Sequence, residues 1–277
     1  MKSRDTRSVR TIEGRVAAIT GAGSGIGRAT AIALKERGCH LALVDRDEAA
    51  LNETAELLGA GIKVSTHVVD VSDRGAMVGL GDDVVTAHGA CHILINNAGI
   101  TSAGRFSDDD LEDVDRLINV NVMGVVLGCH SFLPHLKEVD EGHIVNLSSM
   151  VAFVGLPRNS VYALTKGAVR GFSESLRAEL AGHNIGVTAV FPGAINTNIV
   201  HTATGADAQR LSSLGANRLA PYLMTSPDTV ARRIVGAIDK NRARTLIGPD
   251  SRMLDVVARL APGRSGVVGT LLDLVAP

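Results

Sequence analysis

A tyrosine and a lysine four residues apart, Tyr162 and Lys166, are the pair best suited to chemistry in this sequence of 277 residues. On a helix, this spacing puts both side chains on one face. A phenol can give a proton to a ketone oxygen or take one from an alcohol, but its ordinary pKa of about 10 is high for neutral pH. A neighbouring ammonium group lowers that pKa by stabilising the phenolate. The pair predicts a proton-transfer unit, although two helical neighbours without a function share the same spacing.

A glycine-rich stretch near the amino end joins a strand-like segment to a helical one. It reads T-G-A-G-S-G-I-G over residues 20–27, and a helical pattern follows from Arg28. Glycines let the backbone turn sharply and approach a pyrophosphate, whose charge is attracted by the free amides and the dipole at a helix start. The stretch predicts a dinucleotide-binding loop, with a loop that is glycine-rich for packing alone as the alternative.

An acidic residue ends the second strand-like segment. Asp45 lies 18 residues beyond Gly27, near the separation of about 20 at which an acid reaches the adenosine ribose hydroxyls. Its carboxylate would repel a 2′-phosphate, so NAD is favoured over NADP as the cofactor. Arg46 follows directly and either softens that repulsion or is simply solvated.

Together with further motifs, the sequence resembles the short-chain dehydrogenase/reductase family. The spacing T-G-x-x-x-G-x-G is typical of this family, and nearly the whole chain takes part in the resemblance. The other matching motifs occur in the family's order and are Asp70-Val71, Asn96-Asn97-Ala98-Gly99, Val120-Asn121-Val122, Ser149, Tyr162-x-x-x-Lys166, and Pro192-Gly193 followed by Thr197.

The resemblance implies where a cofactor would lie. Asp70 and Val71 would flank the adenine, and Ile195 and Thr197 would hold the nicotinamide carboxamide. Ser24 stands where NADP-preferring relatives often have a basic residue, which again indicates NAD. The expected cofactor-binding residues are Gly21, Gly23, Ser24, Gly25, Ile26, Gly27, Asp45, Arg46, Asp70, Val71, Asn97, Ala98, Gly99, Tyr162, Lys166, Pro192, Gly193, Ile195 and Thr197.

The resemblance also implies a catalytic tetrad of Asn121, Ser149, Tyr162 and Lys166. Ser149 lies 13 residues before Tyr162, which suits the family, and its hydroxyl would hydrogen-bond the substrate oxygen. Ser148 is a competitor, because neighbouring residues of a strand point to opposite faces. Asn121 would bend its helix and hold a water that relays protons through Lys166.

The elements that must position these residues alternate between short β-branched runs and helix-length segments. We expect strands at residues 15–20, 40–45, 63–70, 92–96, 143–148, 186–191 and 245–247. Buried strands separated by helices predict an α/β fold, a single-domain doubly wound Rossmann sheet of about seven parallel strands flanked by helices. Long helices are expected over 111–137 and 161–181, and Ser226, Pro227 and Asp228 are typical of a helix start.

The chain is expected to form one catalytic domain. Residues 1–13 predict a flexible N-terminal tail, residues 14–277 the domain, and about 198–225 a substrate lid. Apolar side chains of the lid region suggest a lipophilic substrate, although they could equally pack against the core. They are Ile199, Val200, Leu211, Leu214, Leu219, Tyr222, Leu223 and Met224.

Composition and charge argue against several classes of partner. Lys and Arg total 28 against 29 for Asp and Glu, so no nucleic-acid partner is expected. Three scattered cysteines and nine histidines without carboxylates at ligand spacing predict no metal site. Apolar stretches of strand length predict neither a signal sequence nor a membrane span, hence a cytoplasmic protein. Extra apolar positions on the long helices predict a homodimer or homotetramer.

The favoured function is an NAD-dependent oxidoreductase that interconverts a secondary alcohol and a ketone. A dinucleotide-sensing regulator that lost the chemistry is one alternative, but it predicts damage at Ser149, Tyr162 or Lys166, and all three are intact. An NAD-retaining lyase or epimerase is another. Such enzymes usually carry a larger C-terminal substrate domain, whereas 80 residues follow Thr197.

Overall fold

The computed structural model describes residues 11–195 and 224–261, and its strands form one parallel sheet. Seven strands lie in the order β3-β2-β1-β4-β5-β6-β7. Their bounds are β1 (Val16–Thr20), β2 (His40–Asp45), β3 (Val64–Val68), β4 (Ile93–Asn96), β5 (Gly142–Leu147), β6 (Ile185–Pro192) and β7 (Arg244–Ile247). The expected Rossmann sheet is confirmed, with strand ends within one or two residues of the predicted ones.

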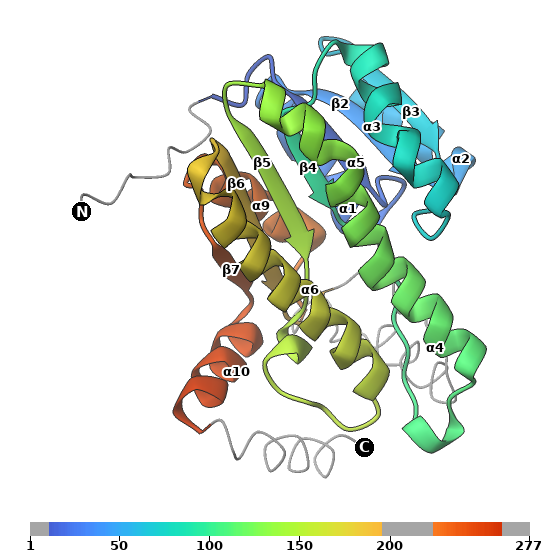
Figure 1. Cartoon of the computed structure of the whole chain (residues 1–277), viewed down its shortest axis with the longest axis vertical. Coiled ribbons are helices and arrows are strands. Elements are labelled where there is room, and N and C mark those ends of the chain that lie inside the picture. Colours follow the sequence, from blue (N-terminus) through green and yellow to red (C-terminus); the bar gives the residue numbers. More distant parts are fainter. Residues whose placement is uncertain (1–10, 196–223, 262–277) are drawn as a thin grey trace.

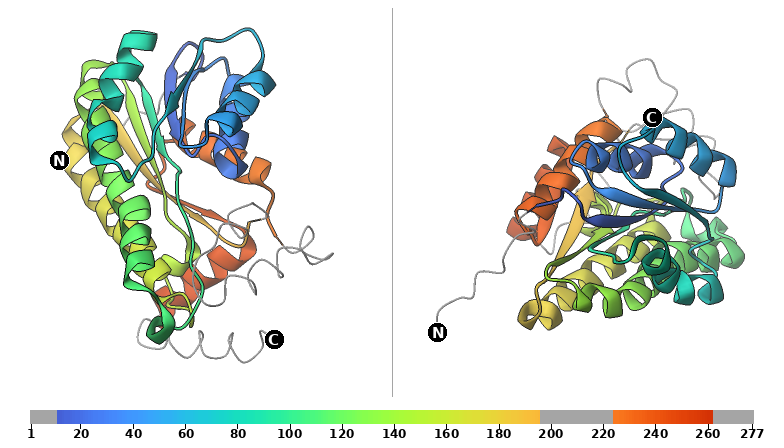
Figure 2. Two further views of the ribbon diagram at one scale, coloured as in Figure 1. Left: turned by 90° about the vertical axis from the view of Figure 1, so that its right-hand side faces the viewer. Right: turned by 90° about the horizontal axis from the view of Figure 1, so that it is seen from above.

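Helices cover both faces of the sheet (Figures 1 and 2). The α-helices are α1 (Gly25–Lys35), α2 (Glu48–Leu58), α3 (Arg74–His88), α4 (Leu111–Ile118), α5 (Gly124–Glu138), α6 (Ser160–Glu179), α9 (Pro227–Asp239) and α10 (Pro249–Leu260). Short 3-10 turns lie at η1 (Phe106–Asp108), η3 (Met150–Ala152) and η4 (Leu180–Gly182). Helices α3, α5 and α6 pack on one face, and α1, α2 and α9 on the other.

Strand alternation divides the core between these two faces. Val16 and Ala18 belong to the cluster beneath α3, α5 and α6, whereas Ala17 and Ile19 belong to the cluster beneath α1, α2 and α9. Both sides of β1 are buried because side chains of a strand alternate and both faces carry helices. The parallel pairing brings the carboxyl ends of all strands to one edge, where ligands bind in folds of this kind.

The chain is already packed against the domain before β1 begins. Ile12, expected in a tail over residues 1–13, is 1% exposed and packs in the core with α1, α2 and α9. The backbone N–H of Arg15 donates to the Ile12 carbonyl at 3.1 Å, and that of Gly14 donates to the Gly38 carbonyl at 3.0 Å. Residues 1–10 of the expected tail lie outside the described residues.

One continuous helical stretch, Leu111–Glu138, is long and apolar enough to cross a membrane by length and composition. This differs from the expectation that apolar stretches are only strand-sized. Its most apolar window has a mean hydropathy of 1.5 and is 56% buried inside the protein. Phe132 and Leu136 are fully buried in the core. The apolar character of this stretch is therefore accounted for largely by packing against the sheet.

Candidate functional site

A cavity of about 720 Å³ at the carboxyl ends of the strands brings together most of the expected site residues. Those that line it are Gly21, Gly23, Ser24, Gly25, Ile26, Asp45, Arg46, Asp70, Val71, Asn97, Ala98, Gly99, Ser149, Tyr162, Lys166, Pro192, Gly193 and Ile195. Gly27 and Asn121 lie behind this lining. Thr197 and the lid region before Met224 fall outside the described residues.

The glycine-rich loop is packed so closely against β4 that side chains would not fit. Gly21 has a φ of +67°, and a Cβ there would lie 2.8 Å from the Asn97 amide nitrogen. A Cβ at Gly27 would collide with the Gly21 carbonyl. Asn97 Nδ2 in turn donates to the Thr20 carbonyl at 2.9 Å, and Thr20 Oγ1 accepts from the Asn97 N–H at 3.0 Å. The glycines are therefore needed for the loop to lie against the end of β4.

The start of α1 faces the cavity with its amides unsatisfied by a side-chain cap. Ser24 occupies the N-cap position, is exposed, and makes no capping hydrogen bond. The first turn of α1 has no acidic residue that would oppose an anion. Free N–H groups and the positive end of a helix dipole suit a phosphate. The residues present thus fit the pyrophosphate of a dinucleotide.

Asp45 holds the glycine-rich loop from the β2 side. Its Oδ2 accepts from the Gly23 N–H at 2.9 Å, and its Oδ1 accepts from the Asp47 N–H at 3.2 Å. A Cβ at Gly23 would stand 2.9 Å from Oδ2, so only glycine allows this approach. Arg46 is half exposed, and its Nη1 lies 3.9 Å from Oδ2 of Asp70, which also lines the cavity.

Asp70 is ionised more readily than an ordinary aspartate. Burial alone would raise its pKa, but hydrogen bonds from Ser72 and the charges of Arg46 and Arg116 outweigh burial and leave the pKa lowered. The Ser72 N–H and hydroxyl both reach Asp70 Oδ1, at 2.9 Å and 2.6 Å.

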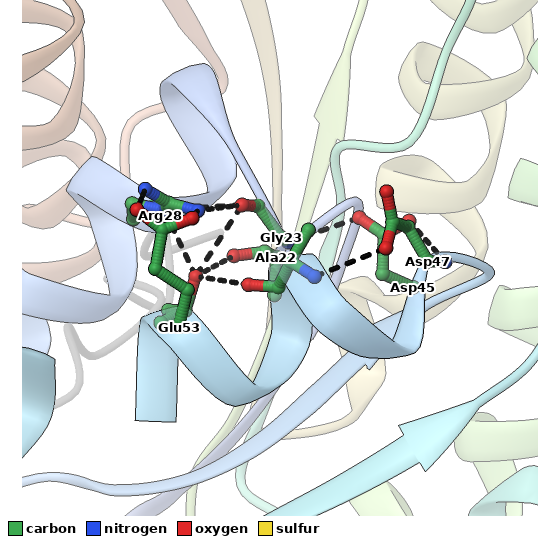
Figure 3. A network of polar contacts seen from close by, with 8 residues as sticks. Ala22, Gly23, Arg28, Asp45, Asp47 and Glu53 are labelled. Carbon is green, nitrogen blue, oxygen red and sulfur yellow. Dashed lines mark hydrogen bonds and ion pairs between the residues drawn. The ribbon is translucent and has the colours of Figure 1, made fainter. Parts of the chain in front are cut away.

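Arg28 and Glu53, which are not among the expected site residues, hold the glycine-rich loop from the side opposite Asp45 (Figure 3). Arg28 donates to the Gly23 carbonyl and forms a two-pronged ion pair with Glu53 at 2.9 Å and 2.7 Å. Thr54 Oγ1 donates to the Ala22 carbonyl at 3.0 Å. The only sign in the sequence that Arg28 contacts the loop is its position directly after the last glycine. Its ion pair with Glu53 joins α1 to α2, and no local sequence pattern predicts it.

The two serines at the end of β5 point in different directions. Ser148 Oγ donates to the Lys166 backbone carbonyl at 2.7 Å, which ties β5 to α6. Ser149 Oγ instead accepts from the Val151 N–H at 3.4 Å, and its hydroxyl acts to lower the pKa of the Tyr162 phenol. Both serines line the cavity. Alternation along a strand thus assigns Ser148 to packing and leaves Ser149 beside the phenol.

Tyr162 and Lys166 lie one turn apart on α6, and the ammonium group is near the phenol ring. Lys166 Nζ lies 5.7 Å from the Tyr162 ring centroid and donates to the Leu147 carbonyl at 3.0 Å. Burial raises the pKa of Tyr162 to about 12, against the opposing hydrogen bond from Ser149. Burial lowers the pKa of Lys166 to about 8. Burial is thus the largest influence on both pKa values, and the lowering of the phenol pKa by Lys166 stays a prediction.

Asn121 lies in an irregular turn between α4 and α5. A single π-helical turn, η2 (Asn119–Met123), interrupts the helix there. Asn121 is fully buried, and its amide bonds both backbone groups of Ile100, accepting at 2.8 Å and donating at 2.9 Å. A Cβ at Gly99 would lie 3.1 Å from Asn121 Oδ1 and 3.4 Å from Lys166 Nζ. Asn121 therefore packs directly behind the cavity wall near Lys166.

The opposite wall of the cavity follows β6. Pro192, Gly193 and Ile195 line it, as expected. Asp250, at the start of α10, belongs to none of the motifs found in the sequence. Its Oδ2 nevertheless accepts a hydrogen bond from the Ala194 N–H of this wall. Within residues 11–195 and 224–261, no group of three or more potential metal ligands is found.

Comparison with known proteins agrees with this geometry. A family model described as short chain dehydrogenase matches residues 15–207. A putative oxidoreductase, SadH, from Mycobacterium tuberculosis is 41% identical over 256 residues, which cover 90% of this chain and 92% of the relative. Dehydrogenase/reductase SDR family member 7B from Bos taurus is 34% identical, covering 91% of this chain and 79% of the relative.

Solved structures lead to the same family. A short chain dehydrogenase/reductase from Burkholderia phymatum in complex with NAD superposes with a TM-score of 0.83 at 30% identity, covering 92% of this chain and 95% of that one. A 3-ketoacyl-(acyl-carrier-protein) reductase from Brucella melitensis complexed with NADH gives a TM-score of 0.75 at 29% identity, covering 87% and 100%. With its family match, its relatives and its fold in agreement, the chain belongs to the short-chain dehydrogenase/reductase family of Rossmann-fold oxidoreductases.

Proposed function

We propose that this protein is an NAD-dependent dehydrogenase/reductase that interconverts a secondary alcohol and a ketone. The observation that carries the proposal is that Ser149, Tyr162 and, one turn further along α6, Lys166 line the same cavity as the glycine-rich loop. A group that can transfer a proton thus lines the same cavity as a loop suited to a dinucleotide. Bound NAD would supply the hydride acceptor, and NADH the donor.

In the direction of reduction, the Tyr162 hydroxyl would donate its proton to the ketone oxygen, and Ser149 would hold that oxygen by a hydrogen bond. The raised pKa of Tyr162, about 12, keeps the phenol protonated near neutral pH, as a general acid requires. The Lys166 ammonium would then stabilise the phenolate that remains. In the direction of oxidation, the phenol pKa must fall, which needs positive charge near Tyr162 from Lys166 and the oxidised nicotinamide.

NAD rather than NADP is supported by the charges around the adenosine end of the cavity. Each Asp45 oxygen accepts one backbone N–H and retains a lone pair for a ribose hydroxyl. Ser24 offers no positive charge to a 2′-phosphate, and the Arg28 guanidinium is paired with Glu53. Two of the structural neighbours described above were solved with NAD or NADH.

A panel of secondary alcohols and ketones, including lipophilic ones, tests the proposal when it is assayed with NAD(H) and NADP(H) by nicotinamide absorbance. We expect turnover with NAD(H), and its loss in Tyr162→Phe, which removes the hydroxyl and leaves the ring. Tight NAD binding without net turnover of any alcohol or ketone would instead favour a dinucleotide-sensing protein or an NAD-retaining lyase or epimerase.

A further inference from the structure

The loop that follows β6 forms the cavity wall next to the reacting residues. In the sheet, β6 lies beside β5, whose end carries Ser149, while β2 and its Asp45 lie on the other side of β1. A dinucleotide whose pyrophosphate rests on the loop after β1 and whose adenosine ribose contacts Asp45 must extend its nicotinamide end toward β5 and β6. Residues 192–195 are therefore among the backbone segments available to that end.

This loop is anchored by contacts with β7 and with the strand-like residue Thr225. The Gly193 N–H donates to the Ile247 carbonyl at 2.8 Å, and the Thr225 N–H donates to the Ala194 carbonyl at 3.0 Å. Ile195 and Thr225 pair as an isolated parallel bridge. These backbone contacts set the course of the loop but leave the Ala194 N–H for another partner.

Asp250, in the first turn of α10, takes that N–H. Its Oδ2 accepts from Ala194 at 2.7 Å, and its Oδ1 accepts from the Ser251 N–H at 2.8 Å. Ser251 Oγ adds a second tie, donating to the Phe191 carbonyl at 2.8 Å. The start of α10, which lies below β7 in Figure 1, is thus bound twice to the end of β6.

Two glycines make room for the Asp250 carboxylate. A Cβ at Gly193 or at Gly248 would collide with the carboxylate oxygen Oδ1. Gly248 also has a φ of +98°, which side-chain-bearing residues rarely adopt. Among the described residues, Asp250 is the one side chain found to hydrogen-bond the backbone of residues 192–195. The loop, the helix start and both glycines therefore fit together around one carboxylate.

We propose that Asp250 is a positioning residue for the nicotinamide end of the cofactor, holding the loop after β6 in the shape that this end contacts. The inference rests on the proposed function, because it assumes that a nicotinamide dinucleotide occupies the cavity. A hydrogen bond to a charged acceptor is stronger than a neutral one, so its loss loosens the loop next to the nicotinamide. The adenosine end, held by α1 and Asp45, does not depend on Asp250.

Binding measurements with two ligands test the proposal. NADH carries the nicotinamide, whereas ADP-ribose has the same adenosine, diphosphate and second ribose without it. By isothermal titration calorimetry, Asp250→Ala should weaken NADH binding by about 10- to 100-fold, the loss expected for one hydrogen bond to a charged group. Its affinity for ADP-ribose should stay within about twofold of the wild type, which is within the scatter of independent sites.

Asp228→Ala is the matched control, because Asp228 follows a proline in the first turn of α9 as Asp250 does in α10, but is exposed. It should change neither affinity. If Asp250→Ala fails to fold, Asp250→Asn preserves the shape and one acceptor oxygen, and it should weaken NADH binding by a smaller factor while sparing ADP-ribose.

Gly193→Ala provides a second, independent test. Alone, its methyl group would collide with Asp250 and should weaken NADH binding, whereas in the Asp250→Ala background it should add little. Equal losses of NADH and ADP-ribose affinity in Asp250→Ala, no loss of either, or full additivity with Gly193→Ala would overturn the role of Asp250. A wild-type protein that binds neither ligand would contradict the proposed function itself.

Discussion

The Gly23 N–H donates to Asp45 Oδ2 at 2.9 Å, so the residue expected to read the adenosine ribose also braces the glycine-rich loop. On the other side of Gly23, Arg28 binds the carbonyl of the same residue. The glycine-rich loop is therefore held at one residue, on both of its backbone polar groups, by two side chains from different elements. Substitutions of Asp45 act on both the ribose contact and the loop.

Asp45→Ala should narrow the preference for NAD over NADP. The substitution removes the negative charge that opposes a 2′-phosphate, so NADP should bind more tightly, while NAD loses a hydrogen-bond acceptor and binds more weakly. Dissociation constants of both dinucleotides at one salt concentration measure the effect. Tighter binding of NADP than of NAD by the wild type would show that Asp45 does not select the cofactor.

Tyr162→Phe should reduce turnover by roughly 10²- to 10⁴-fold, the range for general acid–base catalysis, and leave NAD binding nearly unchanged. Lys166→Ala should lower both turnover and cofactor affinity, because it removes a charge next to the reacting groups. If the two residues act as one unit, the double variant should be little slower than the slower single one. Steady-state kinetics of all four proteins decide this, and full additivity would contradict a shared proton-transfer step.

Burial of Lys166 should make stability depend on pH in a definite direction. Its pKa is about 8 in the folded protein, below the ordinary value of 10.5, so between these values the unfolded chain binds more protons than the folded one. Stability contributed through Lys166 therefore rises with pH across this window, by at most about 3 kcal/mol.

Urea unfolding of wild type and Lys166→Met from pH 7 to 10 isolates this effect, because contributions of the other groups cancel in the difference. The wild type should gain free energy of unfolding relative to the variant as pH rises above 8. A constant difference between the two proteins would mean that the lysine titrates at its ordinary pKa.

A homodimer or homotetramer remains a prediction, now with candidate contact residues. Leu111 of α4 and Leu164 of α6 are 72% and 58% exposed, and Leu260 of α10 is 81% exposed. Exposed large apolar side chains are candidate contacts between subunits. Light scattering at micromolar concentration should give at least twice the monomer mass, and Leu164→Glu should reduce it. A monomer mass for the wild type would refute the prediction.

The elements and the order of the site motifs could be read from the sequence because they depend on local patterns. Runs of buried, β-branched residues mark the strands without reference to the rest of the chain. Ser226 likewise marks the start of α9 as its N-cap, where its side chain accepts from the Thr229 N–H at 3.3 Å. Glycine spacing and the interval between Tyr162 and Lys166 are likewise local. In a parallel sheet, residues that follow different strands then meet at one edge.

Contacts between distant segments required the folded chain. Ser148 and Ser149 are alike in sequence, and only the packing of α6 against β5 separates a hydroxyl bound to a backbone carbonyl from one that acts on the Tyr162 phenol. The pKa of Lys166 depends on how deeply that packing buries the amine. The carboxylate of Asp250 reaches Ala194 across 56 residues. Burial and long-range hydrogen bonds are properties of three-dimensional neighbours, which periodicity along the chain does not encode.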